Sequence, residues 1–233
     1  MQLAIMQPYF LPYIGYFQLM NAVDQFVIYD NIEYTKKGWI NRNRILANGK
    51  DEYMTIPLKS DSDFLCVNQR MLAHSYPDDA TKILRKIEAS YSKAPFYKDA
   101  SEVLAQVLTS SERNLFGFIL NSIKTINTYL NIDTKLVISS DITINHELKG
   151  AEKVIAICKK LQAKHYLNPI GGLDLYNKEK FKTEGIELAF LKSNATSYAQ
   201  YGNAFIPWLS IIDVMMFCPV HQIKEMLLQY ELL

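Results

Sequence analysis

The sequence predicts an α/β protein with a mainly parallel open sheet, flanking helices and a helix-rich middle segment. Residues 3–6 and 26–29 are short apolar runs with the β-branched and aromatic side chains typical of strands. Residues 13–23 between them repeat apolar side chains at helical spacing. A strand, a crossover helix and a second strand give a parallel pair with a right-handed connection. Residues 135–167 repeat this order of elements, which extends the parallel sheet.

The segment after the second strand predicts a hairpin and then a loop. Residues 41–58 alternate in polarity, and Asn48-Gly49 is a turn signal between their two halves. Residues 60–76 are polar and have little periodicity. We therefore expect a connecting loop there, with one short strand at 64–67.

Helices dominate the middle of the chain. The acidic pair at 78–79 suits a helix start, and the apolar residues that follow share one face. Pro95 interrupts this helix, and helical periodicity resumes over 96–108 and 114–130. We interpret residues 78–131 as a helical insertion in the α/β domain.

The remaining elements follow in order to the carboxyl terminus. The expected strands cover 135–139, 164–167 and 185–190, and the expected helices cover 149–161, 209–217 and 220–230. The strand at 185–190 is expected to be the last strand or an edge strand. Ser210 and Asp213 have the spacing of a capping box, with Asp in place of Glu, at the start of their helix.

Composition limits the kind of protein. A chain of 233 residues that is 49% hydrophobic and 21% charged can bury a sizeable core, and we treat residues 1–233 as one domain. A net charge of +1 gives no overall attraction to nucleic acid or to a membrane surface. The three cysteines suit reduced thiols, and the sequence has no zinc motif, secretion signal or membrane-spanning run. These features predict a soluble cytoplasmic protein without a bound metal, and they leave the oligomeric state open.

Polar and aromatic residues collect after the first two predicted strands, at the sheet edge where open α/β proteins bind ligands. The set comprises Gln7, Asp30, Glu33, Lys37, Trp39, Asn41, Arg42 and Asn43. Guanidinium, ammonium and amide groups suit phosphate or carboxylate, and an indole can stack on a base or a sugar. The alternative is that the charged residues form a solvated strand face.

Two later segments carry further candidates. The predicted strand at 164–167 leads into Asn168 and then Gly171-Gly172. A glycine pair after a strand lets a ligand approach the backbone, and it equally suits a simple turn before a helix. Residues 197–205, which include Tyr198, are polar and aromatic, as expected of a loop that could cover a sugar ring.

A set of residues through most of the chain matches one family pattern. The set comprises Gln7-Pro8, Pro12, Gly15-Tyr16-Phe17, Asp24, Asp30, Lys37, Trp39 and residues 41–44, and later residues 166–172, Tyr198 and 209–213. In these residues the sequence resembles the WbqC-like family, bacterial proteins usually encoded with genes for surface polysaccharide and O-antigen synthesis. The resemblance spans nearly the whole chain.

The order of elements at the amino terminus also resembles the Rossmann-like fold of nucleotidylyltransferases and pantothenate synthetase. In that superfamily the first helix carries His-x-Gly-His, and the aligned residues here are Tyr13-Ile14-Gly15-Tyr16. Both histidines are absent, which counts against adenylyl transfer and leaves a nucleotidyl-type transferase as an alternative to an acyl or aminoacyl transferase. Gly15 would still let a phosphate or ribose approach the helix start, or it simply allows close helix packing.

Together the two resemblances imply a transferase that adds an acyl or aminoacyl group, with glycyl as one candidate, to the amine of a nucleotide-linked amino sugar. ATP is the candidate cofactor. The catalytic candidates are Asp30 or Glu33, to orient or deprotonate the amine, and Lys37, which would hold phosphates together with Arg42. The other expected substrate contacts are Gln7, Tyr13, Gly15, Tyr16, Trp39, Asn41, Asn43, Asn168, Gly171, Gly172, Tyr198 and Asp213.

Two other functions fit the same residues. The absent histidines favour a non-catalytic module that binds a nucleotide sugar or a protein of the same pathway. A glycosyltransferase is the other alternative, and Asp61-Ser62-Asp63 has the Asp-x-Asp spacing of that class within a loop that shows little pattern.

Overall fold

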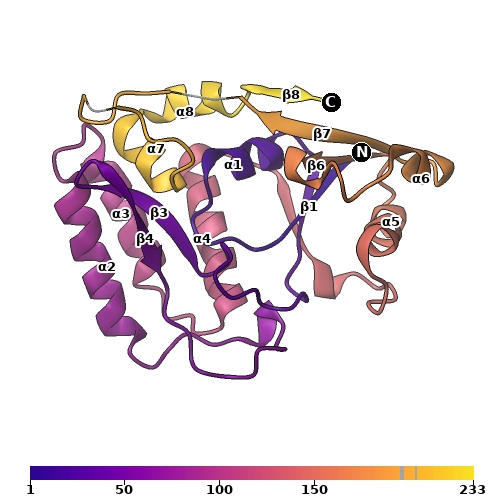
Figure 1. Ribbon diagram of the computed structural model, residues 1–233, viewed down its shortest axis with the longest axis horizontal. Coiled ribbons are helices and arrows are strands. Elements are labelled where there is room, and N and C mark those ends of the chain that lie inside the picture. The colour runs from indigo at the N-terminus through magenta and orange to yellow at the C-terminus, as the bar shows by residue number, and fades with distance from the viewer. Residues whose placement is uncertain (195–196, 203) are drawn as a thin grey trace.

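Six strands form the central sheet, in the order β5-β2-β1-β6-β7-β8 (Figure 1). The structure is a computed structural model that describes residues 1–194, 197–202 and 204–233. Neighbouring strands are parallel except for β8, which is antiparallel to β7. The mainly parallel α/β fold expected from the sequence is therefore confirmed. The strands are β1 (Gln2–Met6), β2 (Gln25–Ile28), β5 (Lys135–Ile138), β6 (His165–Pro169), β7 (Glu187–Ser193) and β8 (Tyr230–Leu232).

Helices cover both faces of the sheet (Figure 1). Successive residues of β1 point to opposite faces, so Ala4 joins the larger buried cluster while Leu3 and Ile5 join the smaller one. The helices of the larger cluster are α1 (Ile14–Asn21), α2 (Tyr76–Tyr91), α3 (Tyr97–Leu108), α4 (Leu115–Leu130), α7 (Ile211–Phe217) and α8 (Val220–Met226). Those of the smaller cluster are α5 (Gly150–Lys160) and α6 (Lys178–Thr183). The expected helix-rich middle segment, α2 to α4, thus packs into the larger core.

The strands β3 (Arg42–Ala47) and β4 (Lys50–Thr55) form a separate antiparallel hairpin, as expected. Its turn residues, Asn48 and Gly49, have φ of 53° and 73°. Two-residue hairpin turns commonly need positive φ at both central positions, which Asn and Gly adopt at low cost. Alternation along β3 buries Asn43 and leaves Arg42 and Arg44 half-buried on the opposite face.

The structure differs from the sequence-based elements in several places. Residues 64–67 lie in the described part of the chain and form no strand, because Cys66 makes a single bridge with Glu33 and a 3₁₀ turn, η1 (Val67–Gln69), follows. The last helix ends at Met226, because the chain then turns back and β8 pairs with β7. β7 is therefore not an edge strand. No periodic pattern marks α6, whose one buried residue is Phe181.

The strand order reverses between β1 and β6. Counted along the chain, the strands of the sheet have the order 3-2-1-4-5-6, which is that of a doubly wound sheet. Ligands of such sheets bind outside the carboxyl ends of the two strands where the order reverses. The sequence predicts a site across the carboxyl ends of the first two strands, β1 and β2. The observed strand order instead places the ligand crevice of the sheet between β1 and β6.

Candidate functional site

A hollow of about 240 Å³ lies beside the loop that follows β1. We call it the aromatic hollow, and it is lined by Tyr9, Pro12, Tyr13, Trp39, Asn43, Arg44 and Trp208. Trp39 and Trp208 are the two tryptophans of the chain, and they remain 38% and 52% exposed. Large aromatic faces left in water are typical of a surface that binds a ring or a partner.

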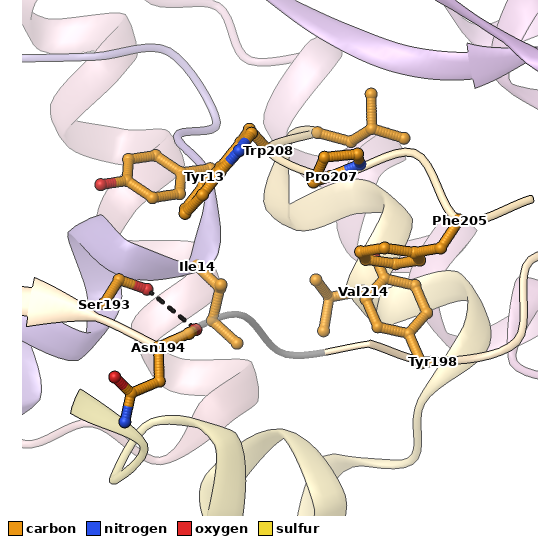
Figure 2. A pocket seen from close by; sticks show the side chains of 10 residues that line it. Tyr13, Ile14, Ser193, Asn194, Tyr198, Phe205, Pro207, Trp208 and Val214 are labelled. Atoms are coloured by element: carbon orange, nitrogen blue, oxygen red, sulfur yellow. Dashed lines mark hydrogen bonds between the residues drawn. The ribbon is translucent and has the colours of Figure 1, made fainter.

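A second, smaller pocket adjoins the aromatic hollow, and Tyr13 and Trp208 line both spaces. Figure 2 shows these two rings next to each other. Their centroids are 5.7 Å apart and their planes meet at 73°, which is an edge-to-face contact. The smaller pocket continues past Phe205 and Tyr198 toward the end of β7. Because the two rings form a shared wall, a change at either one alters both spaces.

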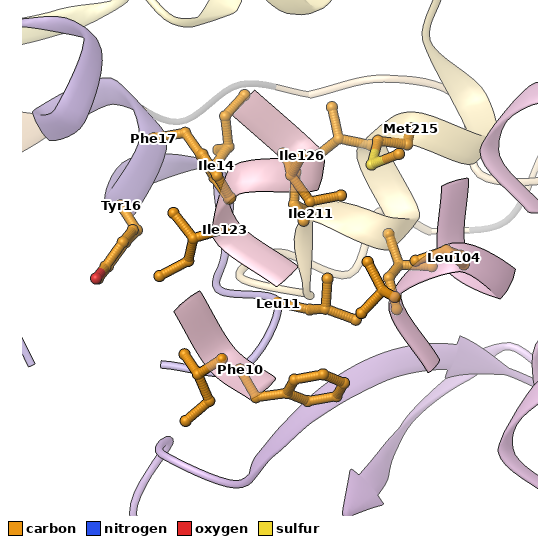
Figure 3. Packing of buried hydrophobic residues seen from close by; sticks show 14 of the residues in the cluster. Phe10, Leu11, Ile14, Tyr16, Phe17, Leu104, Ile123, Ile126, Ile211 and Met215 are labelled. Carbon is orange, nitrogen blue, oxygen red and sulfur yellow. The ribbon is translucent and has the colours of Figure 1, made fainter. Parts of the chain in front are cut away.

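The backbone around the aromatic hollow is strained. Leu11, Lys37 and Trp208 have φ of 41°, 62° and 61°. This left-handed region costs a non-glycine residue about 1–3 kcal/mol, and such residues cluster at ligand sites. Phe10 and Leu11 anchor the loop, since both side chains are buried among residues of α4 and α7 (Figure 3).

Two buried polar side chains hold this loop in place. Asn43 Nδ2 donates to the carbonyls of Phe10 (3.2 Å) and Leu11 (2.9 Å). Ser210 Oγ donates to Leu11 O (2.6 Å) and accepts from Ile212 N (3.3 Å), which confirms Ser210 as the helix cap. Asn43, an expected substrate contact, therefore both lines the aromatic hollow and fixes its backbone.

Gly15 makes room for the Tyr13 ring. A Cβ added to Gly15, in the first turn of α1, would lie 2.4 Å from that ring. Tyr16 is buried, and its hydroxyl donates to Gln7 O (3.1 Å). The exposed side chain of Gln7 accepts from Tyr9 of the aromatic hollow (3.3 Å). Gly15 and Gln7 do not line the aromatic hollow, but they contact two tyrosines that do, Tyr13 and Tyr9.

Arg42 supports the turn that presents Trp39. Its Nε donates to Gly38 O (3.0 Å) and its Nη2 donates to Lys37 O. Its guanidinium lies 4.4 Å from the ring centroid of Tyr53, and Tyr53 stacks on Trp39 at 6.2 Å. These contacts engage Arg42 within the protein, and its role in holding phosphate stays a prediction.

The carboxylates after β2 have different surroundings. Asp30 is buried, with Oδ1 accepting from Ser140 N (2.9 Å) and Oδ2 accepting from Asn68 Nδ2 (2.7 Å). These bonds join the end of β2 to η1 and to the 3₁₀ turn η2 (Ser139–Asp141). Glu33 is exposed, and its carboxylate takes part in none of the hydrogen bonds or ion pairs found among the described residues.

Asn41 and Lys37 complete the expected set on this segment. Asn41 is buried, donates to Ile56 O (2.8 Å) and accepts from the Tyr34 hydroxyl (2.7 Å). Lys37 is exposed in the turn before Trp39. Asn41 therefore fixes the base of the hairpin, while the Lys37 ammonium is accessible to a ligand.

Asn168, Gly171 and Gly172 lie at the carboxyl end of β6, beside the order reversal. Asn168 is buried, and its Oδ1 accepts from the Tyr166 hydroxyl (3.0 Å). Asn168 Nδ2 lies 1.7 Å from where a Cβ of Gly172 would be, whereas Gly171 has open space around it. Close packing against Asn168 thus explains why a glycine stands at position 172. Asn168, Gly171 and Gly172 do not line the aromatic hollow.

Asp213 is a buried carboxylate at the centre of a hydrogen-bond network. Its Oδ1 accepts from the Tyr91 hydroxyl (2.9 Å), and its Oδ2 accepts from the Tyr198 hydroxyl (2.6 Å) and Gln200 Nε2 (2.6 Å). Burial raises the pKa of Asp213, and the three hydrogen bonds oppose this rise. Asp213 therefore does not complete the expected capping box with Ser210. It instead holds Tyr198 against α7, beside the smaller pocket.

The raised pKa of Asp213 predicts a pH dependence of stability. A carboxyl group with a higher pKa in the folded protein than in the unfolded chain binds its proton more tightly when folded. Its contribution to the free energy of unfolding is fully present below about pH 4 and is lost as the pH rises through the folded pKa. We expect the stability of Asp213→Asn, relative to wild type, to improve as the pH rises. Urea unfolding of both proteins from about pH 3 to about pH 8 measures this, and a constant difference would contradict it.

Four residues of the aromatic hollow are not among the sites predicted from the sequence: Tyr9, Pro12, Arg44 and Trp208. Arg44 resembles an ordinary exposed strand residue, and its guanidinium lies 5.5 Å from the Trp39 ring centroid. For Tyr9, Pro12 and Trp208 the sequence does contain a pattern that could have marked them as site residues. Residues 7–13 and 205–208 both combine prolines with aromatic residues, a composition that suits stiff loops presenting rings.

Two kinds of feature are absent from residues 1–194, 197–202 and 204–233. No helix there is long and apolar enough to cross a membrane. No group of three or more histidine, cysteine, aspartate or glutamate side chains there is arranged to hold a metal ion. The Asp61-Ser62-Asp63 motif is thus not part of such a group.

Comparison with known proteins links most of the chain to one family. The model of the WbqC-like protein family matches residues 7–225. "Uncharacterized protein Rv1507c" of Mycobacterium tuberculosis is 28% identical over 218 residues, which make up 92% of each chain. No solved structure matches the chain. The family match includes every residue that lines the aromatic hollow.

Proposed function

The chain belongs to the WbqC-like protein family, and from that premise we propose that it is a transferase whose nucleotide-linked amino sugar binds in the aromatic hollow. The transferred group is an acyl or aminoacyl group, with glycyl as one candidate. The reaction belongs to the assembly of bacterial surface polysaccharide such as O-antigen. ATP is the proposed cofactor, and it would activate the carboxyl group of the donor.

The lining of the aromatic hollow is the observation that carries this proposal. Tyr9, Tyr13, Trp39 and Trp208 contribute four aromatic side chains, and Arg44 contributes a guanidinium. Aromatic and guanidinium planes bind base and sugar rings by stacking. A volume of about 240 Å³ suits one substituted six-membered ring, since a cavity of about 150 Å³ accommodates benzene.

The proposed chemistry needs a base for the sugar amine. The amine nitrogen attacks the activated acyl carbon, an amide bond forms, the activating group leaves and the amine gives up a proton. Both oxygens of Asp30 already accept hydrogen bonds, whereas Glu33 is exposed. Of the two catalytic candidates, Glu33 is therefore the better proton acceptor. Lys37, at the same turn as Trp39, is the proposed contact for substrate phosphate.

A non-catalytic binding module is the second candidate function. The residues that line the aromatic hollow include neither a carboxylate nor a histidine, so the hollow itself offers no general base. This lining would suffice to hold a sugar or a nucleotide for another protein of the pathway. Formation of the amide product separates the two functions, because a binding module leaves the sugar unchanged.

Binding of nucleotide-linked amino sugars tests the proposed site. Both tryptophans line the aromatic hollow, so a UDP-linked or dTDP-linked amino sugar that enters it should change the tryptophan fluorescence of the wild-type protein. Trp208→Ala removes one stacking face and should weaken binding by about tenfold or more in titration calorimetry.

Leu228→Ala is the matched control, because Leu228 is an exposed apolar side chain outside the aromatic hollow. It should leave the affinity unchanged. The proposal would be wrong if no nucleotide-linked sugar bound the wild-type protein. It would also be wrong if Trp208→Ala bound one as tightly as the control variant.

A further inference from the structure

Arg70 is a buried cation with unused hydrogen-bond donors. Its side chain is 4% exposed and its guanidinium lies 4.5 Å from the ring centroid of Tyr34. Its Nε and Nη2 are buried and have no hydrogen-bond partner among the described residues. These nitrogens form the edge of a guanidinium that pairs with two oxygens of a carboxylate or phosphate. Burial of such an edge without a partner is costly, so it points to a ligand.

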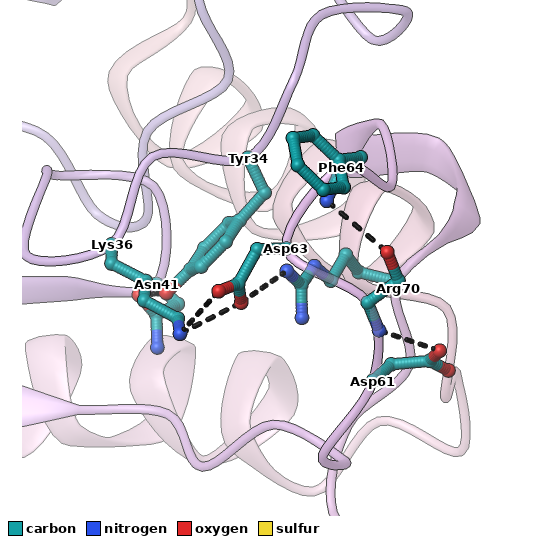
Figure 4. Close-up of polar contacts among 8 residues, drawn as sticks. Tyr34, Lys36, Asn41, Asp61, Asp63, Phe64 and Arg70 are labelled. Carbon is teal, nitrogen blue, oxygen red and sulfur yellow. Dashed lines mark hydrogen bonds and ion pairs between the residues drawn. The ribbon is translucent and has the colours of Figure 1, made fainter.

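A carboxylate from an exposed loop lies in front of this edge. Asp63 Oδ1 is 2.7 Å from Lys36 Nζ and 4.0 Å from Arg70 Nη2. Figure 4 shows Asp63 between the two cations. The Asp63 side chain remains 59% exposed, and the next residue, Phe64, is 81% exposed. The hydrogen bond from Lys36 lowers the pKa of Asp63, as expected for a carboxylate beside cations.

Positive charge is in excess around Tyr34. Burial raises the pKa of Tyr34, and Arg70, Arg42 and Lys36 all oppose that rise. Three cations therefore act on one hydroxyl group, while Asp63 is the carboxylate that pairs with Lys36 and approaches Arg70. A dianion could replace the single negative charge of Asp63 with a gain in attraction.

We propose that Lys36 and Arg70 form a binding site for the diphosphate of a nucleotide-linked sugar, and that the Asp63 carboxylate occupies this site until the ligand displaces it. The substrate class rests on the function proposed above. An oxygen pair of the diphosphate would take the Nε and Nη2 edge of Arg70, and Lys36 would neutralise a further oxygen. Because Arg70 is buried, the loop that carries Asp63 must move aside first.

The position of Lys36 connects this site to the aromatic hollow. Gly38 N donates to Thr35 O (3.2 Å), which closes a tight turn of residues 35–38; Lys36 belongs to this turn, and Trp39 follows it directly. Lys37 in this turn has φ of 62°, a conformation usually taken by glycine. One turn therefore carries a proposed phosphate contact and an aromatic wall. A nucleotide-linked sugar has the matching chemistry, with charged phosphates next to a ring.

Inorganic pyrophosphate is the probe for this site, because it carries the charge of the ligand and lacks a ring. Asp63→Asn removes the competing carboxylate and should tighten pyrophosphate binding by about fivefold in titration calorimetry, the scale of an exposed ion pair. Asp61→Asn is the matched control. Asp61 belongs to the same loop and loses the same charge, yet its carboxylate contacts Ser62 N rather than the cations. We expect a change of less than about twofold for it, since exposed charges are screened.

Lys36→Met added to Asp63→Asn should abolish the gain, and Lys36 is exposed enough that its replacement leaves the fold intact. The anion site would be wrong if the Asp63 and Asp61 variants bound pyrophosphate equally, or if the added Lys36→Met had no effect. A different result would show that the anion site is real but the proposed function is wrong. In that case Trp208→Ala would not weaken binding of a nucleotide-linked sugar, while the response of pyrophosphate to Asp63→Asn would persist.

Discussion

Asp213→Ala is expected to lower the free energy of unfolding by about 3–5 kcal/mol, because it leaves buried polar groups without their partner. Three donors lose their acceptor together: the hydroxyls of Tyr91 and Tyr198, and the amide of Gln200. The Tyr91 hydroxyl also accepts from Leu46 N of the hairpin strand β3 (2.8 Å), so the substitution should weaken the attachment of β3 as well. Urea unfolding followed by circular dichroism measures the change.

Tyr198→Phe is the control for this network. It removes one donor and leaves the carboxylate bonded to Tyr91 and Gln200, so the expected loss is about 1–2 kcal/mol. A clear ranking, with the alanine variant least stable, supports the network as the element that holds α7, β3 and the segment around Tyr198 together. An alanine variant as stable as wild type would refute that role.

Gly172→Ala should destabilise the protein by about 1–3 kcal/mol through overpacking. The added methyl group would coincide with the amide of Asn168, which is 1.7 Å from the Cβ position. Asn168 cannot easily turn away, since it is buried and accepts from the Tyr166 hydroxyl. Thermal unfolding of the purified variant gives the size of the effect.

Gly171→Ala is a matched control one residue away. Its Cβ would meet nothing within 4 Å, so the same chemical change should be close to neutral there. Asn168→Ala offers a second comparison, because removal of the amide should make Gly172→Ala much less costly in the double variant than alone. Equal losses at both glycines, or additive losses in the double variant, would contradict the packing explanation.

The segment Tyr13 to Tyr16 has a clear structural role in the structure. Tyr13 forms the wall shared by the aromatic hollow and the smaller pocket. Gly15 leaves room for that ring, and Tyr16 is buried with its hydroxyl on Gln7 O. The distant resemblance of this segment to the nucleotidylyltransferase superfamily stays a prediction.

Local patterns were sufficient for most of the fold. The amino-terminal strand, helix and strand, the Asn48-Gly49 hairpin and the helices α2 to α4 all follow from periodicity and turn chemistry between near neighbours in the chain. The same kind of information failed for β8, where three residues form a strand because β7 lies beside them. A short segment whose structure depends on a distant partner has no pattern of its own.

The candidate site shows the same division. Tyr13, Trp39 and Asn43 could be singled out from the sequence because each belongs to a segment dense in polar and aromatic residues. Trp208 lies almost two hundred residues from Tyr13, and folding alone brings their rings to 5.7 Å. Arg70 looked like any other loop residue until the structure showed its guanidinium buried beside Tyr34.

The family, the parallel sheet and the segment that carries Trp39 could all be predicted before the structure was known, since they depend on residue identity and on spacing along the chain. Three features became visible only in the folded chain: the hydrogen bonds of the buried Asp30, the place of Trp208 in the aromatic hollow, and the position of Asp63 opposite Arg70. These features depend on burial and hydrogen-bond pairing, which are set by residues far apart in the chain. No local pattern records which of those residues will meet.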